Sequence, residues 1–401
     1  MLLSKAYILS FCLTFIIGST GYCQSFTIYN TSNSPLENNT IRCFAKDSSG
    51  VIWVGTDFGL YSYDYTNWEV YTVANSSIES NQIRSLKVDS INNLWVGFFD
   101  AGLSKFDGLT WQDWNASNSS IPDENIKSIT IDPKGFIWLG TGLGLVKKDT
   151  NDTWPLWNTL NSNMWSNNVT SVLHDDTSLY FGTLNGGLNL MNDTSIVIYN
   201  LYTSVFPDNT VLSIGKSTSS LWCATPSQGA VEYLGPDLFQ VYNESNSLLP
   251  TNALTNVHIG ANDVFFGSQS KGIIIYNNGD FNYYNTENSS MPVDHVSSVF
   301  DDAGTVWVGT VGGGLVKMEG FYSKINEYNG LQVLKVIDNV VYLLYDTKGA
   351  YNVYDIMGKL ILCKSVNSSS INLSMLKPGI YIIRIIDVQK NITFSNKVVV
   401  D

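Results

Sequence analysis

Three basic side chains occupy one position of a repeated pattern. Arg42, Arg84 and Lys127 each follow the first apolar residue of a predicted strand. The chain has 22 Lys and Arg residues against 35 Asp and Glu residues, for a net charge of −13, so a local set of cations is unusual in it. Arginine and lysine form charge-assisted hydrogen bonds with carboxylate and sulfate groups. We therefore expect a basic arc that binds an acidic ligand. The same position in four later copies carries neutral residues, namely Thr170, Leu212, Thr255 and Ser297.

Aromatic residues fall in loops next to the predicted arc. Phe58, Phe98 and Phe99 come after the second strand of the first two copies, where Phe98 replaces the usual threonine. Trp165 stands at a loop position that is proline or glutamate in the other copies, and His295 lies at a loop–strand junction. Cations beside aromatic rings suit carboxylated or sulfated sugars, which stack on rings and pair with charge.

A second interpretation of the three bases remains open. They can pair with nearby acids, because charged groups near a rim are usually paired or solvated. The arc would then only neutralise the rim. The candidate partners are Asp57, Asp100, Glu79 and Glu124.

Catalytic and metal chemistry have little support in the sequence. Most acids fall at equivalent turn positions, and residues 302–307 fit the Asp box of some glycosidase propellers, which is a structural turn. A hydrolase needs two convergent carboxylates, or an arginine cluster with a tyrosine nucleophile. With three histidines in the chain, we predict no metal and no cofactor. A pI near 4.6 also argues against a nucleic-acid partner.

One short motif concerns modification. Asp89-Ser90-Ile91 resembles the Asp-Ser/Thr-apolar acceptor of bacterial O-glycosylation, which makes Ser90 a candidate acceptor. A tight turn explains the same three residues equally well, because Asp favours the first position of a type I turn.

An internal repeat positions all of these residues. An aromatic–x–Gly/Ala–Thr/Ser/Phe tetrad recurs seven times at spacings of 42 or 43 residues. Each unit contains four β-branched or aromatic runs separated by Gly, Asn, Asp and Ser, which predicts four strands. Four strands in about 42 residues are typical of one propeller blade. The tetrads begin at Trp53, Trp95, Trp138, Tyr180, Trp222, Phe265 and Trp307.

These units predict an all-β, seven-bladed β-propeller over residues 24–328. The seventh unit lacks a good fourth strand, and residues 25–30 supply one before the first unit. We expect this N-terminal segment to complete the seventh blade, because the pairing would cover an open sheet edge. The loops that precede each first strand and follow each second strand then lie on one side of the ring, because strand directions alternate.

The repeat resembles a known family. The pattern Asp-x-x-Gly-x-x-Trp-Val-Gly-Thr…Gly-Gly-Leu, seen at residues 47–60 and 301–315, is similar to the two-component regulator propeller repeat. In that family such repeats often form the sensing part of hybrid histidine kinases. No kinase or receiver segment is recognisable here, so the resemblance implies the propeller and leaves the sensor role open.

Residues 329–401 depart from the repeat and predict a small β-sandwich. Residues 354–359, 376–385 and 396–400 resemble the C-terminal sorting domain of the type IX secretion system. The resemblance implies that the secretion machinery is a partner, and that the folded cargo crosses the outer membrane of a Gram-negative bacterium.

Residues 1–23 predict a signal peptide. Lys5 supplies the charge, residues 6–17 form an apolar run too short to span a bilayer, and cleavage is expected between Cys23 and Gln24. A lipoprotein acylated at Cys23 is the alternative. We therefore expect a secreted or surface-displayed, non-catalytic propeller that binds a glycan or protein. Two alternatives are an extracellular polysaccharide lyase or hydrolase, and a structural component of surface assembly or gliding.

Overall fold

The computed structural model describes residues 25–175, 177–192, 195–277, 279–319, 326–327, 333–337, 340–355, 360–387 and 392–400. The chain divides into two compact units, Met1–Gly320 and Phe321–Asp401. The boundary predicted after residue 328 falls a short way inside the second unit. The predicted signal peptide, with its alternative acylation site at Cys23, lies outside the described residues.

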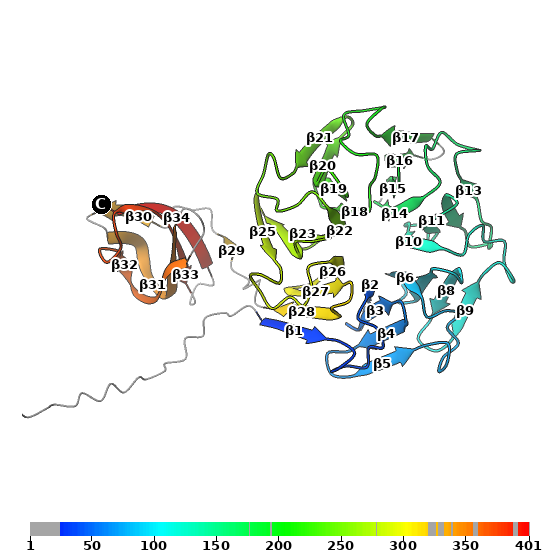
Figure 1. Ribbon diagram of the computed structural model, residues 1–401, viewed down its shortest axis with the longest axis horizontal. Coiled ribbons are helices and arrows are strands. Elements are labelled where there is room, and N and C mark those ends of the chain that lie inside the picture. The colour runs from blue at the N-terminus through cyan, green and yellow to red at the C-terminus, as the bar shows by residue number, and fades with distance from the viewer. Residues whose placement is uncertain are drawn as a thin grey trace, which may run out of the picture. The chain divides into compact units, whose positions relative to one another are not determined.

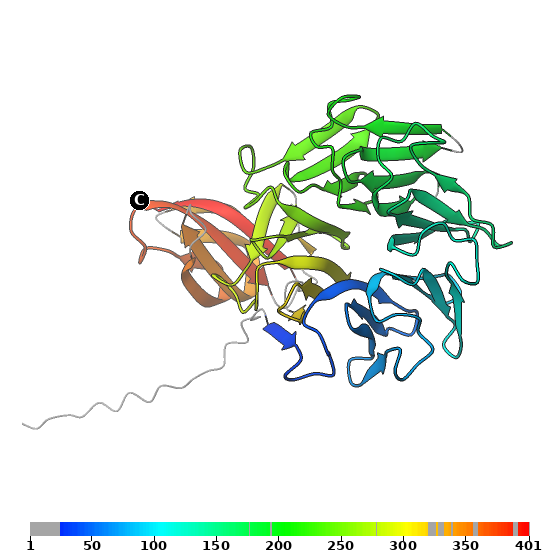
Figure 2. The same ribbon diagram turned by 45° about the vertical axis from the view of Figure 1, so that its right-hand side comes forward.

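The first unit is a ring of antiparallel sheets, which confirms the all-β prediction (Figure 1). Its described residues form seven four-stranded sheets, one for each sequence repeat, and we call each sheet a blade. The inner strand of each blade lies nearest the centre of the ring, as the labels β2, β6, β10, β14, β18, β22 and β26 show (Figure 1). Figure 2 shows the same ring turned. No helix in this or any other described part is long and apolar enough to cross a membrane.

The first three blades hold the predicted basic arc. Blade 1 consists of β2 (Ile41–Lys46), β3 (Ile52–Thr56), β4 (Gly59–Tyr63) and β5 (Trp68–Tyr71). Blade 2 consists of β6 (Ile83–Val88), β7 (Leu94–Phe98), β8 (Leu103–Phe106) and β9 (Trp111–Trp114). Blade 3 consists of β10 (Ile126–Ile131), β11 (Ile137–Thr141), β12 (Leu145–Lys148) and β13 (Leu156–Trp157).

The next three blades repeat this order. Blade 4 consists of β14 (Val169–His174), β15 (Leu179–Thr183), β16 (Gly187–Asn192) and β17 (Ser195–Tyr199). Blade 5 consists of β18 (Ser213–Lys216), β19 (Leu221–Ala224), β20 (Ala230–Gly235) and β21 (Leu238–Tyr242). Blade 6 consists of β22 (Leu254–Ile259), β23 (Val264–Ser268), β24 (Ile273–Asn277) and β25 (Asp280–Tyr284).

The last blade is built from both ends of the unit. Its strands β26 (Val296–Asp302), β27 (Thr305–Thr310) and β28 (Leu315–Glu319) are joined at the rim by β1 (Ser25–Tyr29). β1 runs antiparallel to β28 from the pair Ser25–Glu319 to the pair Tyr29–Leu315. As predicted, the N-terminal strand completes this blade and covers a sheet edge that would otherwise be exposed.

The repeated acids hold the repeated tryptophans in place. The Trp53 Nε1–H donates to Asp47 Oδ2 at 3.1 Å, and the same bond joins Trp95 to Asp89 at 3.0 Å. The other oxygen of Asp89 accepts the backbone N–H groups of Ile91 and Asn93, which closes the tight turn. These contacts support the interpretation of the acids as turn formers, because their lone pairs are already used.

Small polar residues tie neighbouring blades together near the centre. Ser213 of β18 accepts the Val257 backbone N–H of β22 at 3.1 Å and the Asn256 side-chain amide at 3.2 Å. Ser171 makes the same tie to Ile214 at 3.2 Å. The hydroxyl of Ser298, at the equivalent position of β26, is buried and has no hydrogen-bond partner among the described residues.

This difference gives a stability prediction with an internal control. Ser213→Ala removes the acceptor of one buried and one partly buried N–H group, so we expect the free energy of unfolding to fall by about 1–2 kcal/mol. Ser298→Ala removes an unbonded hydroxyl and should change it by less than about 0.5 kcal/mol. All 11 tryptophans precede residue 321, so tryptophan fluorescence during urea unfolding reports on the propeller alone. Equal effects of the two substitutions would contradict the role of these ties.

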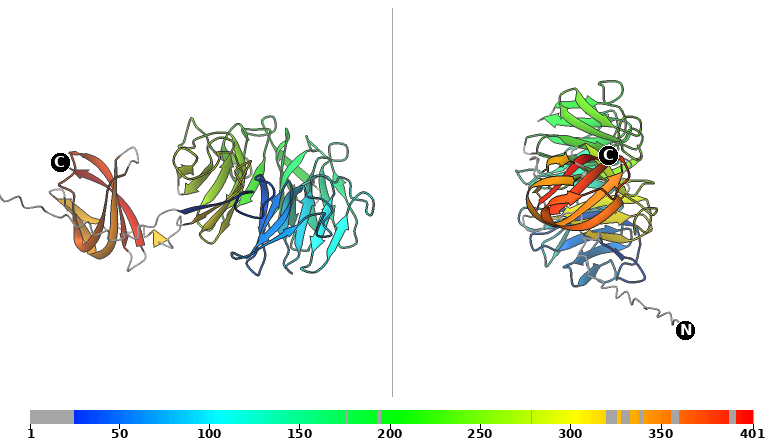
Figure 3. Two further views of the ribbon diagram at one scale, coloured as in Figure 1. Left: turned by 60° about the horizontal axis from the view of Figure 1, so that its bottom comes forward. Right: turned by 90° about the vertical axis from the view of Figure 1, so that its left-hand side faces the viewer.

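The second unit is one hydrogen-bonded sheet, seen in Figure 3. Its strands are β29 (Asn326–Glu327), β30 (Val333–Ile337), β31 (Val340–Asp355), β32 (Leu360–Asn372), β33 (Gly379–Asp387) and β34 (Ile392–Val400). One edge of β31 pairs with β32 near both ends of the strand, and the other edge pairs with β30 at the start and with β33 at the end. The sheet encloses a core that includes Val341, Val353, Val366 and Ile383. Two separate sheets, as a β-sandwich requires, are not confirmed and stay a prediction.

Candidate ligand-binding site

The two sides of the propeller differ in their connections. We call the side where inner strands begin the bulge face; it carries the loops at residues 30–40, 72–82, 115–125, 158–168, 200–210, 243–253 and 285–295. We call the other side the turn face; it carries the tight turns between first and second strands, such as residues 47–51 and 89–93. The predicted basic arc belongs to the bulge face.

A backbone bulge presents each basic side chain. The pairing register of β2 with β3 shifts between Ile41 and Cys43, so Arg42 lies in the bulge. The same shift places Arg84 in β6 and Lys127 in β10. A bulge leaves one residue unpaired and re-aims its side chain. The short loops between second and third strands pack beside these bulges, since the Phe99 backbone N–H donates to the Gln82 carbonyl at 3.0 Å.

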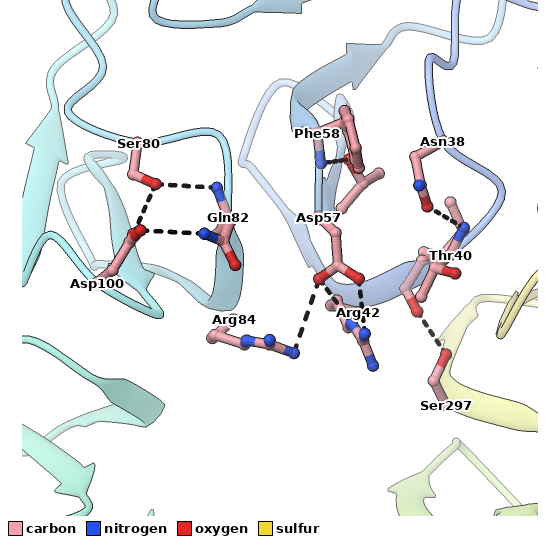
Figure 4. Close-up of polar contacts among 12 residues, drawn as sticks. Asn38, Thr40, Arg42, Asp57, Phe58, Ser80, Gln82, Arg84, Asp100 and Ser297 are labelled. Atoms are coloured by element: carbon pink, nitrogen blue, oxygen red, sulfur yellow. Dashed lines mark hydrogen bonds and ion pairs between the residues drawn. The ribbon is translucent and has the colours of Figure 1, made fainter.

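Two arginines share one carboxylate at this face (Figure 4). Arg42 Nε donates to Asp57 Oδ1 at 2.9 Å and Nη2 donates to Oδ2 at 2.6 Å, which is a bidentate pair. Arg84 Nη1 lies 3.7 Å from Asp57 Oδ1, within ion-pair range but too far for a hydrogen bond. Asp57 therefore offsets one of the two positive charges.

The arginines govern the ionisation of Asp57. Burial alone raises the pKa of this carboxyl, but the hydrogen bond and charge of Arg42, with the charge of Arg84, outweigh burial and lower the pKa below 3.8. A carboxyl whose pKa is lower in the folded state stabilises the fold above its unfolded pKa. That contribution disappears as the pH falls through the folded pKa.

A pH-dependent stability prediction follows from the Asp57 pair. At pH 7 we expect Asp57→Asn to be less stable than the wild type by about 1–3 kcal/mol, because two arginines lose their counter-charge. The difference should shrink as the pH falls below about 4. Urea unfolding followed by tryptophan fluorescence at pH 7 and pH 3 measures it. A difference of the same size at both pH values would contradict the proposed ionic role.

Arg84 has spare binding capacity. Its guanidinium lies 4.7 Å from the centre of the Phe99 ring, a cation–π contact. Its Nε is buried and has no hydrogen-bond partner among the described residues. The neighbouring Asp100 is occupied, because it accepts from Ser80 Oγ at 2.7 Å and Gln82 Nε2 at 3.0 Å (Figure 4). Arg84 is thus the arc residue with the most uncommitted N–H groups.

Lys127 lies one blade further on. Its ammonium donates to the Asn168 side-chain carbonyl. Burial lowers the pKa of Lys127, and the charge of Asp123 opposes that shift. Asp123 itself accepts the backbone N–H groups of Gly142 and Leu143 at 2.8 and 3.0 Å. The alternative of a paired rim therefore holds for Arg42, while Arg84 and Lys127 are less fully neutralised.

Most of the predicted aromatic residues are exposed on this face. Phe58 and Phe99 are 51% and 43% exposed, and Trp165 is 49% exposed. Trp165 stacks on Tyr202 of the next long loop, with ring centres 5.5 Å apart. His295 is exposed. Partial desolvation by the surrounding protein, together with the charge of Arg42, lowers the pKa of its imidazole.

Phe98 is a correction. Its side chain is fully buried in a core with Ile78 and Ile83, so it cannot contact a ligand on the surface. In blades 1 and 3 the equivalent Thr56 and Thr141 are also fully buried and bond a glycine carbonyl across the loop. Phe98 stands at the fourth position of the tetrad, which is buried in every blade, and the next residue, Phe99, is exposed.

Several exposed apolar residues of this face were missed from the sequence, and three of them lie near the predicted aromatic residues. Leu143 and Leu184 occupy the short loops of blades 3 and 4, next to the Phe58 and Phe99 loops in ring order, and Tyr202 joins Trp165. Tyr202 could have been noticed in the sequence, because it is the one aromatic residue at its aligned loop position. The other units hold Ser32, Ala74, Ser117, Leu160, Ser245 and Glu287 there.

The remaining site predictions concern metals and modification. No group of three or more His, Cys, Asp or Glu side chains suited to a metal occurs in the described parts of the chain. Ser90 is exposed at the tip of its turn on the turn face. O-glycosylation there stays a prediction; an intact mass with unmodified Ser90 would contradict it.

Family models match segments of both units. Residues 35–58 and 120–142 match the family model of the two component regulator propeller, and residues 337–401 match that of the secretion system C-terminal sorting domain. No match was found among curated proteins.

Several solved structures share the fold. The extracellular domain of the hybrid two component system BT3049 from B. thetaiotaomicron is 20% identical, with a TM-score of 0.63 over 91% of this chain. PorZ of Porphyromonas gingivalis is 13% identical, with a TM-score of 0.61 over 93%. The chain spans 55% of the BT3049 domain and 61% of the PorZ chain.

Virginiamycin B lyase from Staphylococcus aureus is 14% identical, with a TM-score of 0.60 over 74% of this chain and 99% of the lyase. At these identities the likeness shows the fold alone. Two segments of the first unit therefore match the two component regulator propeller, and the end of the second unit matches the secretion system C-terminal sorting domain.

Proposed function

We propose that the protein is a surface-displayed, non-catalytic propeller whose bulge face binds an acidic glycan. The observation that carries the proposal is the meeting of Arg84 and Phe99. A guanidinium with unused N–H groups lies against an exposed ring, in a chain with a large negative net charge. Such a pair can bind a carboxylate or sulfate through charge and a sugar ring through stacking.

The surroundings of this pair support a binding surface. Exposed apolar side chains continue along blades 1 to 4, from Phe58 to the Trp165–Tyr202 stack. Lys127 adds a second cation between the two aromatic groups in ring order. A run of apolar residues beside cations is what an extended acidic sugar chain requires.

Three carboxylates beside the basic arc support a non-catalytic role. Asp57 accepts hydrogen bonds from Arg42. Asp100 accepts them from Ser80 and Gln82. Asp123 accepts them from the backbone N–H groups of the neighbouring loop. A general acid or base must be able to exchange a proton with the substrate. These acids are instead committed to the protein, although a lyase or hydrolase remains the alternative.

Binding to sulfated and carboxylated polysaccharides on a glycan array tests the proposal. We expect wild-type binding, and a loss of at least about tenfold in affinity for Arg84→Ala. The triple variant of Arg42, Arg84 and Lys127 to alanine should lose binding altogether. Asp57→Asn should bind more tightly, because it frees both arginines. Arg384→Ala, in the second unit, is the matched control and should be unchanged.

Two results would overturn this function. One is the absence of binding to every acidic glycan, and the other is undiminished binding by the triple variant. A structural role in surface assembly is the second candidate, because PorZ is described as an essential surface component of the type IX secretion system. Co-purification of a cell-surface protein with the wild type, together with no glycan binding, would favour that role.

A further inference from the structure

A cavity lies on the turn face, on the opposite side of the ring from the proposed glycan site. It lies between the tight turns of blades 2 and 3 and has a volume of about 690 Å³, within the usual size range of small-molecule sites. The end of the inner strand of blade 4, at His174, also lines it. Nothing in the proposed function uses this cavity.

Lys87 of β6 is the unusual group in the cavity. It lines the cavity, and neither an ion pair nor a hydrogen bond to its ammonium is formed by the residues that the structure describes. Two other lysines at the ends of inner strands are paired: Lys46 with Asp302, and Lys216 with Asp175 at 3.8 Å. Lys87 is exposed on the cavity wall. The protein around its ammonium desolvates it in part, which lowers the pKa of Lys87.

The two carboxylates that line the cavity, Asp89 and Asp132, form no ion pair with the Lys87 ammonium. Asp89 accepts hydrogen bonds from Ile91, Asn93 and the Trp95 indole. Asp132 accepts two backbone N–H groups of its own turn and the Trp138 indole. Both carboxylates are thereby committed to the turns.

The remaining groups around the cavity fit an anion with an apolar body. Ile91, Pro133 and Ile137 supply apolar wall, and Lys134 supplies a second, exposed ammonium. His258 of blade 6 does not line the cavity. Burial, together with the charge of Lys87, lowers the pKa of His258 to about 4, so this imidazole is neutral at pH 7 and adds no charge near Lys87. Lys87 is thus a cation without a counter-ion beside an apolar wall.

We propose that the cavity binds a small monocarboxylate with an apolar body, whose carboxylate pairs with the Lys87 ammonium and whose body packs on Ile91 and Pro133. The site is separate from the glycan surface, so the two can be bound together. A carboxylate supplies the counter-charge that Lys87 lacks in the protein.

Titration calorimetry with benzoate tests the site. We expect saturable binding to the wild type, and binding weakened at least about tenfold in Lys87→Met. Methionine keeps the length of the side chain and removes only an unpaired charge, so the variant should melt at the wild-type temperature or above. Lys271→Met, on the bulge face, is the control and should bind benzoate as the wild type does.

A neutral probe completes the test. Benzamide has the shape of benzoate without its charge, and it should bind at least about tenfold more weakly. Equal binding of benzoate by Lys87→Met, equal binding of benzamide, or no saturable benzoate binding would each overturn the proposal. The triple variant of the glycan site should bind benzoate normally, so failure of either site can be told from failure of the other.

Discussion

Truncation of the chain after residue 320 is expected to stop surface delivery while leaving the propeller folded. The sorting domain matches residues 337–401, and the propeller needs none of these residues to close, because β1 pairs with β28 within the first compact unit. Cell fractionation should show full-length protein at the surface or in the medium. The truncated protein should remain in the periplasm, at least tenfold depleted outside the cell.

Two measurements keep this result interpretable. The truncated protein recovered from the periplasm should give the tryptophan fluorescence of the folded propeller, since every tryptophan lies within it. The Arg84→Ala variant of the full chain should reach the surface in normal amounts, because its change concerns binding alone. Normal surface delivery of the truncated protein would contradict the role of the sorting domain.

The second large effect is expected at the closure of the ring. Tyr29 of β1 packs against Tyr63 and Trp68 of blade 1 and Trp307 of the last blade, with ring centres 5.6 to 6.3 Å apart. Its hydroxyl lies 3.4 Å from that of Tyr63. Tyr29→Ala should therefore lower the free energy of unfolding by about 3 kcal/mol, because an aromatic contact between both ends of the ring is lost.

Tyr283→Ala provides the matched control. Tyr283 also lies on an outer strand, β25, but is 37% exposed, so its loss should cost less than about 1 kcal/mol. Urea unfolding of both variants, followed by tryptophan fluorescence, makes the comparison. If the two substitutions destabilise the propeller equally, the N-terminal strand does not stabilise the ring as argued.

The repeat predicted much of the fold, because the residues that recur with its period have the same structural role in every blade. The tetrad aromatic, the turn acid and the apolar pattern of each strand each determine one part of a blade, so equivalent residues adopt equivalent positions. The same regularity predicted that β1 would join β28. The second unit has no such repeat, and a strand as long as β31 can change partners along its length, which the sequence pattern does not show.

The candidate site was less predictable, because it depends on departures from the repeat. A phenylalanine replaces the threonine at the buried fourth position of the blade 2 tetrad, so Phe98 lies in the core and only Phe99 is on the surface. Asp57 contacts both Arg42 of blade 1 and Arg84 of blade 2. The spacing of these residues in the sequence does not define the distance between side chains of different blades. Equivalent positions could be identified from the sequence, but the contacts between blades could not.

Hydrogen exchange of the protein with and without a bound acidic polysaccharide tests the central claim most directly. Amides of the Asp57–Phe58 and Phe99–Asp100 loops and the Trp165 loop should exchange more slowly in the complex, while the turn-face amides of residues 89–93 and 132–136 stay unchanged. This result would place the ligand on the bulge face beside Arg84. Protection confined to the turn face, or no protection at saturating polysaccharide, would contradict the account.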